Sequence, residues 1–302
     1  MIARIFATPQ SFDGNLSLTV AELEERVEGL AKDYALIRRH RETNQFLIHN
    51  DTYDVEFIAG IKLYELLFDS AIGKDRIGRD AYNALQKIAT ESSIATETVN
   101  TIINLLTTHN EGLCHAIIAF KEIPNVARQH QLIYNVSGWL KFRRFMLGNY
   151  PGNGGYFIEE CKKYFPSLVF HEQNKTSIGQ ILDVCPVRIL YHLAALNDKF
   201  RESQQPHLNR SQVLLHFSAN AALDENASLE GNTTRKPALT FKFENDKEAL
   251  EEVCCEPHMK LCYNDAYPGD RSYSTDRRIY FHEGVPSIQN GKLLVAHIGR
   301  HL

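Results

Sequence analysis

The hydrophobic pattern of the chain changes near Ala227, and this change constrains the fold more than any other feature of the sequence. Before it, apolar residues recur at a spacing near 3.6, which is typical of amphipathic helices. After it, apolar and polar residues alternate, which is typical of strands with one buried face. The pattern predicts an α+β protein, in which a large, mostly helical region precedes a small antiparallel β-sheet.

The helical signals cover the chain up to about Phe200. Thr19-Val-Ala-Glu22 is a capping box that opens a long helix, and Ser177-Ile-Gly-Gln180 repeats the pattern before a helix that Pro186 should break. Further helices are predicted over residues 55–68, 79–90, 96–106, 113–120, 137–147 and 156–165.

A polar stretch with a proline, residues 201–211, marks the end of this region. We therefore predict two domains, a mostly helical recognition or regulatory region over residues 1–205 and an antiparallel-sheet domain over residues 206–302. The second begins with a helix over residues 212–224, and a short amphipathic helix over residues 246–253 lies between its first two strands. Strands are predicted over residues 239–243, 258–261, 277–282 and 292–298.

Composition narrows the classes of function. The 302 residues are 43% hydrophobic and 23% charged, as in an ordinary globular protein, and the net charge of −4 gives no global support for a nucleic-acid partner. No apolar run approaches the roughly 20 residues that cross a bilayer. The six cysteines lack regular spacing and no signal peptide precedes them, so we expect reduced thiols, no membrane contact and a cytoplasmic location.

Alternation along the C-terminal strands places basic and imidazole side chains on one side of the predicted sheet. His258 and Lys260 point one way, and Arg278, Tyr280 and His282 share a face of the next strand. We expect this face to be solvent-exposed, because the intervening residues are apolar. The complete set of candidates on this face or at its edge is His258, Lys260, Arg277, Arg278, Tyr280, His282, His297, Arg300 and His301.

These residue types match what RNA cleavage without a metal ion requires. The ribose 2′-OH must lose a proton and the 5′-oxygen must gain one, and histidine titrates in the working range of pH. The charge that develops on phosphorus must be stabilised, for which the guanidinium fork of arginine and the point charge of lysine are suited. Tyrosine can stack on a base or donate a proton.

The same strands resemble those of the RelE/ParE-type toxins, whose active members are ribonucleases. The stretches that carry the resemblance are PHMKL, RRIYF and LLVAHIGR, in the last quarter of the chain. His258 and Lys260 fall where that family has paired lysines, with histidine in place of the first, and Arg278 falls where it has an arginine before an aliphatic-aromatic strand. Arg300 and His301 follow the Ile-Gly pair, where the family has terminal basic residues.

The resemblance implies a metal-independent endoribonuclease of the hydrolase class, acting as a toxin or antiphage defence effector. The implied partners are RNA and an inhibitor or antitoxin protein, and no cofactor is implied. His258, Lys260, Arg278, His297 and His301 are the candidate catalytic residues. The candidate substrate-binding residues are Tyr280, His282, Arg277 and Arg300.

Three other interpretations remain open. The same sheet would serve equally as a non-catalytic surface that binds nucleic acid or protein within a defence complex. Cys254, Cys255, His258 and Cys262 are close enough in sequence to suggest a zinc site, although adjacent residues of a strand point in opposite directions. The basic clusters at residues 38–41 and 141–144 are able to grip phosphates or simply lie on solvated helix faces.

Overall fold

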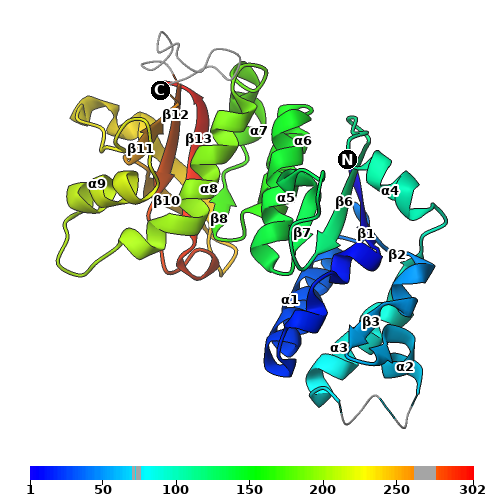
Figure 1. Ribbon diagram of the computed structural model, residues 1–302. Coiled ribbons are helices and arrows are strands. Elements are labelled where there is room, and N and C mark those ends of the chain that lie inside the picture. The colour runs from blue at the N-terminus through cyan, green and yellow to red at the C-terminus, as the bar shows by residue number, and fades with distance from the viewer. Residues whose placement is uncertain (70–71, 73–75, 262–276) are drawn as a thin grey trace. The chain divides into compact units, whose positions relative to one another are not determined.

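The computed structural model describes residues 1–69, 72, 76–261 and 277–302 (Figure 1). The chain forms two compact units, Met1–Met146 and Leu147–Leu302. The domain boundary predicted near residue 205 falls inside the second unit.

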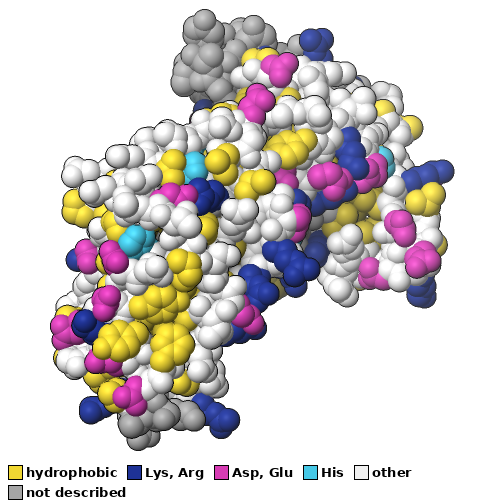
Figure 2. Space-filling model, turned by 90° about the vertical axis from the view of Figure 1, so that its right-hand side faces the viewer, with side chains coloured by type: hydrophobic (Ala, Val, Ile, Leu, Met, Phe, Trp, Pro, Cys, Tyr) yellow, Lys and Arg dark blue, Asp and Glu magenta, His cyan; other side chains and the backbone are white. Residues whose placement is uncertain are grey.

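None of the helices in the described part of the chain is long and apolar enough to span a membrane. Charges of both signs are interspersed over the face that Figure 2 presents, in keeping with the near-neutral composition.

The first unit is built around a parallel sheet with strand order β5-β2-β1-β6-β7. Its strands are β1 (Ile2–Ala7), β2 (Asn44–Ile48), β5 (Ser93–Ile94), β6 (Leu113–Ala119) and β7 (Gln131–Ile133). A separate antiparallel pair is formed by β3 (Glu56–Ile58) and β4 (Ile61–Lys62). The order reverses at β1, the topology of doubly wound α/β sheets. At that point the Ser11 carbonyl, after β1, accepts a hydrogen bond of 2.9 Å from the Phe120 N–H, after β6.

The helices of this unit alternate with its strands (Figure 1). They are α1 (Val20–Arg39), α2 (Leu63–Phe68), α3 (Arg79–Glu91), α4 (Val99–Leu105) and the start of α5 (Val136–Asn149). The capping box at the start of α1 is confirmed, because the Glu22 N–H donates to the Thr19 hydroxyl and the Thr19 N–H donates to the Glu22 carboxylate. This reciprocal pair satisfies backbone donors that the first turn leaves open.

The predicted fold class is wrong for this unit, which is mixed α/β rather than mostly helical. The clearest case is Leu113–Ala119, predicted as a helix and observed as the buried strand β6. A strand of a parallel sheet is covered on both faces, so its sequence is a continuous apolar run rather than an alternating one. Such a run has no period that separates a strand from a buried helix.

The second unit contains a mixed sheet with strand order β11-β12-β13-β8. These strands are β11 (His258–Lys260), β12 (Arg277–His282), β13 (Leu293–Arg300) and β8 (Leu168–Phe170). β13 is antiparallel to β12 and parallel to β8. A second, two-stranded antiparallel sheet consists of β9 (Thr240–Glu244) and β10 (Leu250–Cys254).

Both faces of the mixed sheet are covered. Phe281 of β12 packs edge-on against Phe200 at a ring-centroid distance of 5.4 Å, which places α8 on one face. On the other side, Leu294 and Ala296 of β13 share a core with Phe241 and Phe243 of β9. The helices of this unit are α6 (Gly154–Tyr164), α7 (Asn174–Ser177), α8 (Pro186–Ser203) and α9 (Arg210–Asn220).

Most of the C-terminal predictions match these elements. The four predicted strands correspond to β9, β11, β12 and β13, and the helix predicted over residues 212–224 corresponds to α9. Two predictions are wrong. Residues 246–253, predicted as a short helix, end in β10, and the sheet is mixed rather than antiparallel because β8 joins it from earlier in the chain.

Candidate functional site

Strand pairing places several of the candidate side chains in one row across the mixed sheet. His258 lies opposite Tyr280, and Tyr280 lies opposite His297, so the row crosses β11, β12 and β13. Lys260 lies opposite Arg278 in the neighbouring row. The alternation that the sequence predicts for β12 therefore gathers residues from three strands on one face.

Tyr280 is surrounded by three imidazole rings. Its ring centroid lies 5.2 Å from that of His258, 6.1 Å from that of His297 and 6.4 Å from that of His301. The Arg278 guanidinium is close enough to affect the ionisation of Tyr280, His258 and His301. We call these five residues, His258, Arg278, Tyr280, His297 and His301, the sheet cluster.

The sheet cluster is buried, whereas the sequence suggested a solvent-facing surface. The exposed fraction is 0% for Tyr280, 5% for His258, 5% for His297 and 9% for Arg278. The segment before β9 contributes to the cover, because Ser228 forms an isolated β-bridge with His258. His301 is the most accessible member, with a side chain that is 21% exposed.

The buried histidines are held by hydrogen bonds that define their tautomers. His258 Nδ1 lies 3.3 Å from the Glu256 carbonyl oxygen, which can only accept, so Nδ1 carries the proton and Nε2 keeps a lone pair. That Nε2 lies 3.3 Å from the Ser228 hydroxyl. In His297, Nε2 lies 2.9 Å from the Arg300 carbonyl oxygen and carries the proton, which leaves Nδ1 to accept from Gln173.

Burial sets the protonation states of the sheet cluster near neutral pH. Burial, with a smaller effect from the Arg278 cation, lowers the pKa of His258 to about 4. Burial also lowers the pKa values of His297 and His301. The pKa of Tyr280 is raised by burial, although Arg278 opposes this shift. The three imidazoles are therefore neutral at pH 7, and Arg278 keeps its charge.

Polar atoms of Arg278 and Tyr280 lack hydrogen-bond partners among the described residues. They are Nε and Nη1 of Arg278 and the hydroxyl of Tyr280, all of which are buried. A buried donor without a partner typically costs 1–3 kcal/mol, and more when it is charged. Arg278 cannot lower this cost by losing its proton, because guanidinium stays charged in proteins. An anion beside this residue pair would accept from the edge of the guanidinium that it meets and from the Tyr280 hydroxyl.

Two residues outside the predicted set complete the surroundings of the sheet cluster. Arg235 Nη1 lies 2.8 Å from a ring nitrogen of His301, and a Glu230 carboxylate oxygen lies 3.9 Å from His301 Nε2. Both come from the segment before β9, Arg235 from a short 3-10 helix (Thr233–Leu239). Sequence reasoning missed them because no periodicity links this segment to the sheet, and only its docking against β11 brings it there.

The remaining candidates lie apart from the sheet cluster or at its margin. Lys260 Nζ forms an ion pair of 2.9 Å with Glu225. Arg277 lies opposite Arg300 in the register, and alternation puts Arg277 on the other face of β12, with Ile279 and Phe281. Arg300 is exposed at the end of β13.

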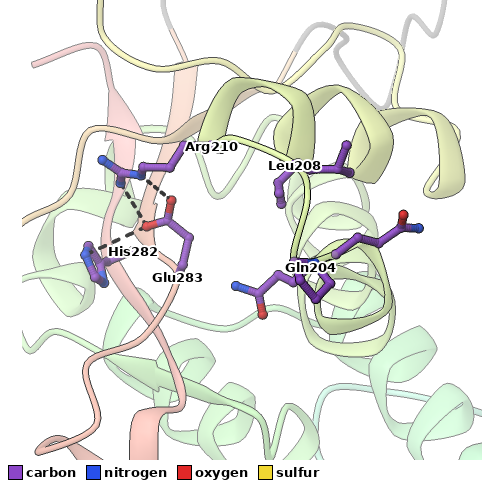
Figure 3. Close-up of a pocket in the computed structure, with 8 residues that line it drawn as sticks. Gln204, Leu208, Arg210, His282 and Glu283 are labelled. Atoms are coloured by element: carbon purple, nitrogen blue, oxygen red, sulfur yellow. Dashed lines mark hydrogen bonds and ion pairs between the residues drawn. The ribbon is translucent and has the colours of Figure 1, made fainter.

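His282 belongs to a different cavity at the far end of β12 (Figure 3). This cavity has a volume of about 680 Å³. It is lined by Gln204, Gln205, Pro206, Leu208, Arg210, Val213, His282 and Glu283. Arg210 and Glu283 face each other there, with Nε–Oε1 and Nη2–Oε2 distances of 2.7 and 2.9 Å. Burial would raise the pKa of Glu283, but these bonds from Arg210 keep it below its usual value. The charges of this cavity are thus satisfied internally.

The alternative zinc interpretation receives no support from the described part of the chain. No three side chains of histidine, cysteine, aspartate or glutamate converge there in a way that would hold a metal ion. Cys254 and Cys255 are free thiols, and Cys262 lies outside the described residues.

Comparisons of the chain with protein-family models, with curated proteins and with solved structures found no match. The function of the sheet cluster therefore has to be argued from its chemistry.

Proposed function

We propose that this protein is a metal-independent endoribonuclease and that the sheet cluster is its catalytic face. The observation that carries the proposal is the buried guanidinium of Arg278, whose Nε and Nη1 have no hydrogen-bond partner among the described residues, beside the Tyr280 hydroxyl, which also lacks one there. A fixed cation with donors left over by the surrounding protein is suited to an anionic ligand. A phosphodiester supplies that anion, and the surrounding imidazoles supply proton transfer.

The tautomers suggest how the roles are divided. His258 is neutral and its Nε2 lone pair contacts only the Ser228 hydroxyl, which can rotate away, so His258 is the proposed general base for the 2′-OH. Arg278 would hold the phosphate and stabilise the charge that develops on it. His301 is the most accessible member and is neutral at rest, so it would relay a proton from solvent to the departing 5′-oxygen, one ring nitrogen giving a proton as the other takes one up. The His297 ring lies against Tyr280, with a centroid distance of 6.1 Å.

Lys260 and Arg300, at the margin of the sheet cluster, are proposed for substrate contacts rather than for the chemical step. Arg277 on the opposite face and His282 in the other cavity are left out of the proposed site. Lys260 already pairs with Glu225, so its charge is partly used within the protein. A toxin or antiphage role, restraint by an inhibitor or antitoxin, and a cytoplasmic location all belong to the proposal through the resemblance and the cysteine pattern. The first unit would then recognise RNA or a partner protein.

Cleavage of RNA by the purified full-length chain tests the proposal. We expect products with 2′,3′-cyclic phosphate ends, formed without added metal, and a loss of about 10²-fold or more in rate for Arg278→Ala and for His258→Ala. Tyr280→Phe should lose less, because it removes one hydroxyl. The matched control is Lys242→Ala, which removes an exposed cation from β9, a strand that contributes no residue to the sheet cluster.

The proposal fails if the wild-type protein cleaves no RNA, or if folded Arg278→Ala and His258→Ala variants cleave at the wild-type rate. Growth arrest on expression provides a second readout, because arrest that persists in both variants contradicts a ribonuclease active site in the sheet cluster. Circular dichroism of each variant separates loss of activity from loss of fold.

One observation favours a second candidate, a non-catalytic module that binds nucleic acid or protein. Both ring nitrogens of His258 and of His297 already have neighbours within 3.4 Å, which suits rigid positioning as well as it suits proton transfer. In that case Arg278→Ala would abolish RNA binding, and no cyclic phosphate would form with any variant.

A further inference from the structure

The first unit contains a basic groove between α1 and α3 that is separate from the sheet cluster. It consists of two adjoining hollows of about 480 and 340 Å³, which share Tyr34, Arg38 and Arg41. Each volume lies within the range of small-ligand sites. We call the two hollows together the α1–α3 groove.

Short side chains make this groove possible. Its floor is formed by Ala31 and Ala35 of α1, Ala84 and Ile88 of α3, and the ring of Tyr34 between the helices. Alanines at the contact leave space that longer residues would fill. The second hollow continues the groove onto the sheet, where it is lined by residues Asn44, Gln45, Phe46 and Leu47 of β2.

The charge of the groove is strongly one-sided. Its lining includes four cations, Arg38, Arg39, Arg41 and Lys87, against the single carboxylate of Glu91. Arg38 pairs with Glu91 and lies over the Tyr34 ring, 5.9 Å from its centroid. Arg38 is therefore tied to the wall of the groove.

The other three cations are available to a ligand. Arg39, Arg41 and Lys87 are exposed, and none of them forms an ion pair with a described carboxylate. Three unpaired cations around an apolar floor would suit a polymer ligand in which negatively charged phosphates alternate with flat bases. Single-stranded nucleic acid is such a chain, since its phosphates bind cations and its bases pack on apolar and aromatic surfaces.

We propose that the α1–α3 groove binds single-stranded RNA, with phosphates on Arg39, Arg41 and Lys87 and a base against the floor. The choice of RNA rests on the proposed function, whereas the polyanion specificity comes from the groove itself. A peptide of acidic residues alone would satisfy the cations but has no flat group to lie against the alanine side chains of the floor. The groove thus binds the substrate through the first unit, whereas the chemical step takes place in the second.

The test uses the full-length chain carrying Arg278→Ala, so that neither cleavage nor the anion site of the sheet cluster contributes. The probe is a fluorescein-labelled 12-nucleotide RNA without secondary structure, and anisotropy gives Kd at several salt concentrations. The triple variant Arg39→Ala, Arg41→Ala, Lys87→Ala should bind at least 10-fold more weakly. The slope of log K against log salt should become smaller in magnitude by about 2, because each lost phosphate contact on a single strand removes roughly 0.7 from it.

Lys32→Ala is the matched control, because Lys32 is an exposed cation of α1 that does not line the groove. It should leave Kd within about twofold of its parent. The assignment is overturned if the triple variant binds as tightly as its parent, or if Lys32→Ala alone weakens binding as much as the triple variant. It is also overturned if a polyglutamate peptide of equal charge competes as well as unlabelled RNA does.

A second measurement separates this proposal from the proposed function. With Arg278 restored, the triple variant should cleave a dinucleotide at the wild-type rate while its KM for a long RNA rises about 10-fold. If the wild-type chain cleaves nothing and the groove still binds RNA, only the catalytic proposal has failed. If cleavage is found and the triple variant leaves the KM for long RNA unchanged, only the groove assignment has failed.

Discussion

Each unit buries an ionisable side chain with polar atoms that lack a hydrogen-bond partner in the described structure, but only one of the two side chains can become neutral. In the first unit, Asp33 of α1 is 0% exposed, and neither carboxylate oxygen has a partner at ordinary hydrogen-bond geometry among the described residues. Burial raises the pKa of Asp33 to about 8, although the Asn135 backbone opposes this shift. Asp33 therefore takes up a proton and becomes neutral.

In the second unit, Arg278 cannot become neutral in this way. Its exposed fraction is 9%, and its Nε and Nη1 have no hydrogen-bond partner among the described residues. A guanidinium stays charged in proteins, so this cost is not relieved by loss of a proton. The comparison teaches which unpartnered group indicates a ligand. A buried carboxyl is explained by protonation alone, whereas a buried guanidinium with unused donors requires an anion or a cost to stability.

The largest expected effect follows from removing the charge of Arg278. Arg278→Met keeps a long side chain, and we expect RNA cleavage to fall by about 10³-fold. The melting temperature should stay the same or rise, because an unsatisfied buried charge has been replaced by an apolar group. Initial rates and thermal unfolding of the same preparation check both. A variant that unfolds much earlier than the wild type would show that Arg278 has a structural partner instead of a ligand.

The second effect concerns the carboxyl of the other unit. Because the pKa of Asp33 is raised in the folded chain, the folded state binds more protons than the unfolded state between about pH 4 and pH 8. The stability that this proton gives is complete below pH 4 and is lost as the pH rises towards 8.

Asp33→Asn removes that dependence. Its free energy of unfolding should match the wild-type value near pH 4 and exceed it near pH 8 by on the order of 5 kcal/mol. Urea unfolding at both pH values measures the difference. A constant gap between variant and wild type across the range would mean that Asp33 does not titrate between 4 and 8 in the folded protein.

A smaller effect with the opposite sign is expected for a histidine pair of the first unit. His109 Nε2 lies 2.9 Å from His130 Nδ1. Burial, followed by the effect of His130 and His115, lowers the pKa of His109 to about 4. The unfolded chain therefore binds more protons between about pH 6.5 and pH 4, and stability falls as the pH falls.

His109→Gln keeps an amide near His130 and does not titrate. Between pH 7 and pH 5 this variant should lose about 1 kcal/mol less stability than the wild type. Urea unfolding at the two pH values measures this loss of stability for the variant and the wild type. Asp33→Asn is the control, and between pH 7 and pH 5 it should lose at least as much stability as the wild type. Equal losses in His109→Gln and wild type would remove the histidine pair as a source of acid sensitivity.

The smallest effect is a pKa change inside the sheet cluster. Arg278 adds to burial in lowering the pKa of His258, so Arg278→Met should raise that pKa from about 4 by up to about one unit. NMR titration of the His258 ring protons measures it. His192, which is buried in α8 and whose pKa burial also lowers to about 4, is the internal control and should not move. An unchanged His258 would place Arg278 too far away to act on it.

The sequence identified part of the candidate site because one physical rule applies there. In β11 and β12 the side chains alternate across a sheet, so His258, Arg278 and Tyr280 were predicted on one face and are found there. The rule does not cover the approach of Glu230 and Arg235, which depends on how the segment before β9 docks. It also gave no sign that the face would be buried, because polar residues on an alternating strand ordinarily face water.

The sequence by itself determined the local elements whose signals lie within a few residues, such as the cap at Thr19 and the alternating strands β9, β11, β12 and β13. Only the tertiary structure decided the parallel sheet of the first unit, the entry of β8 into the second, and the burial of Arg278. The physical reason is that a strand buried on both faces has no period of its own, and the environment of a charge is set by segments distant in sequence.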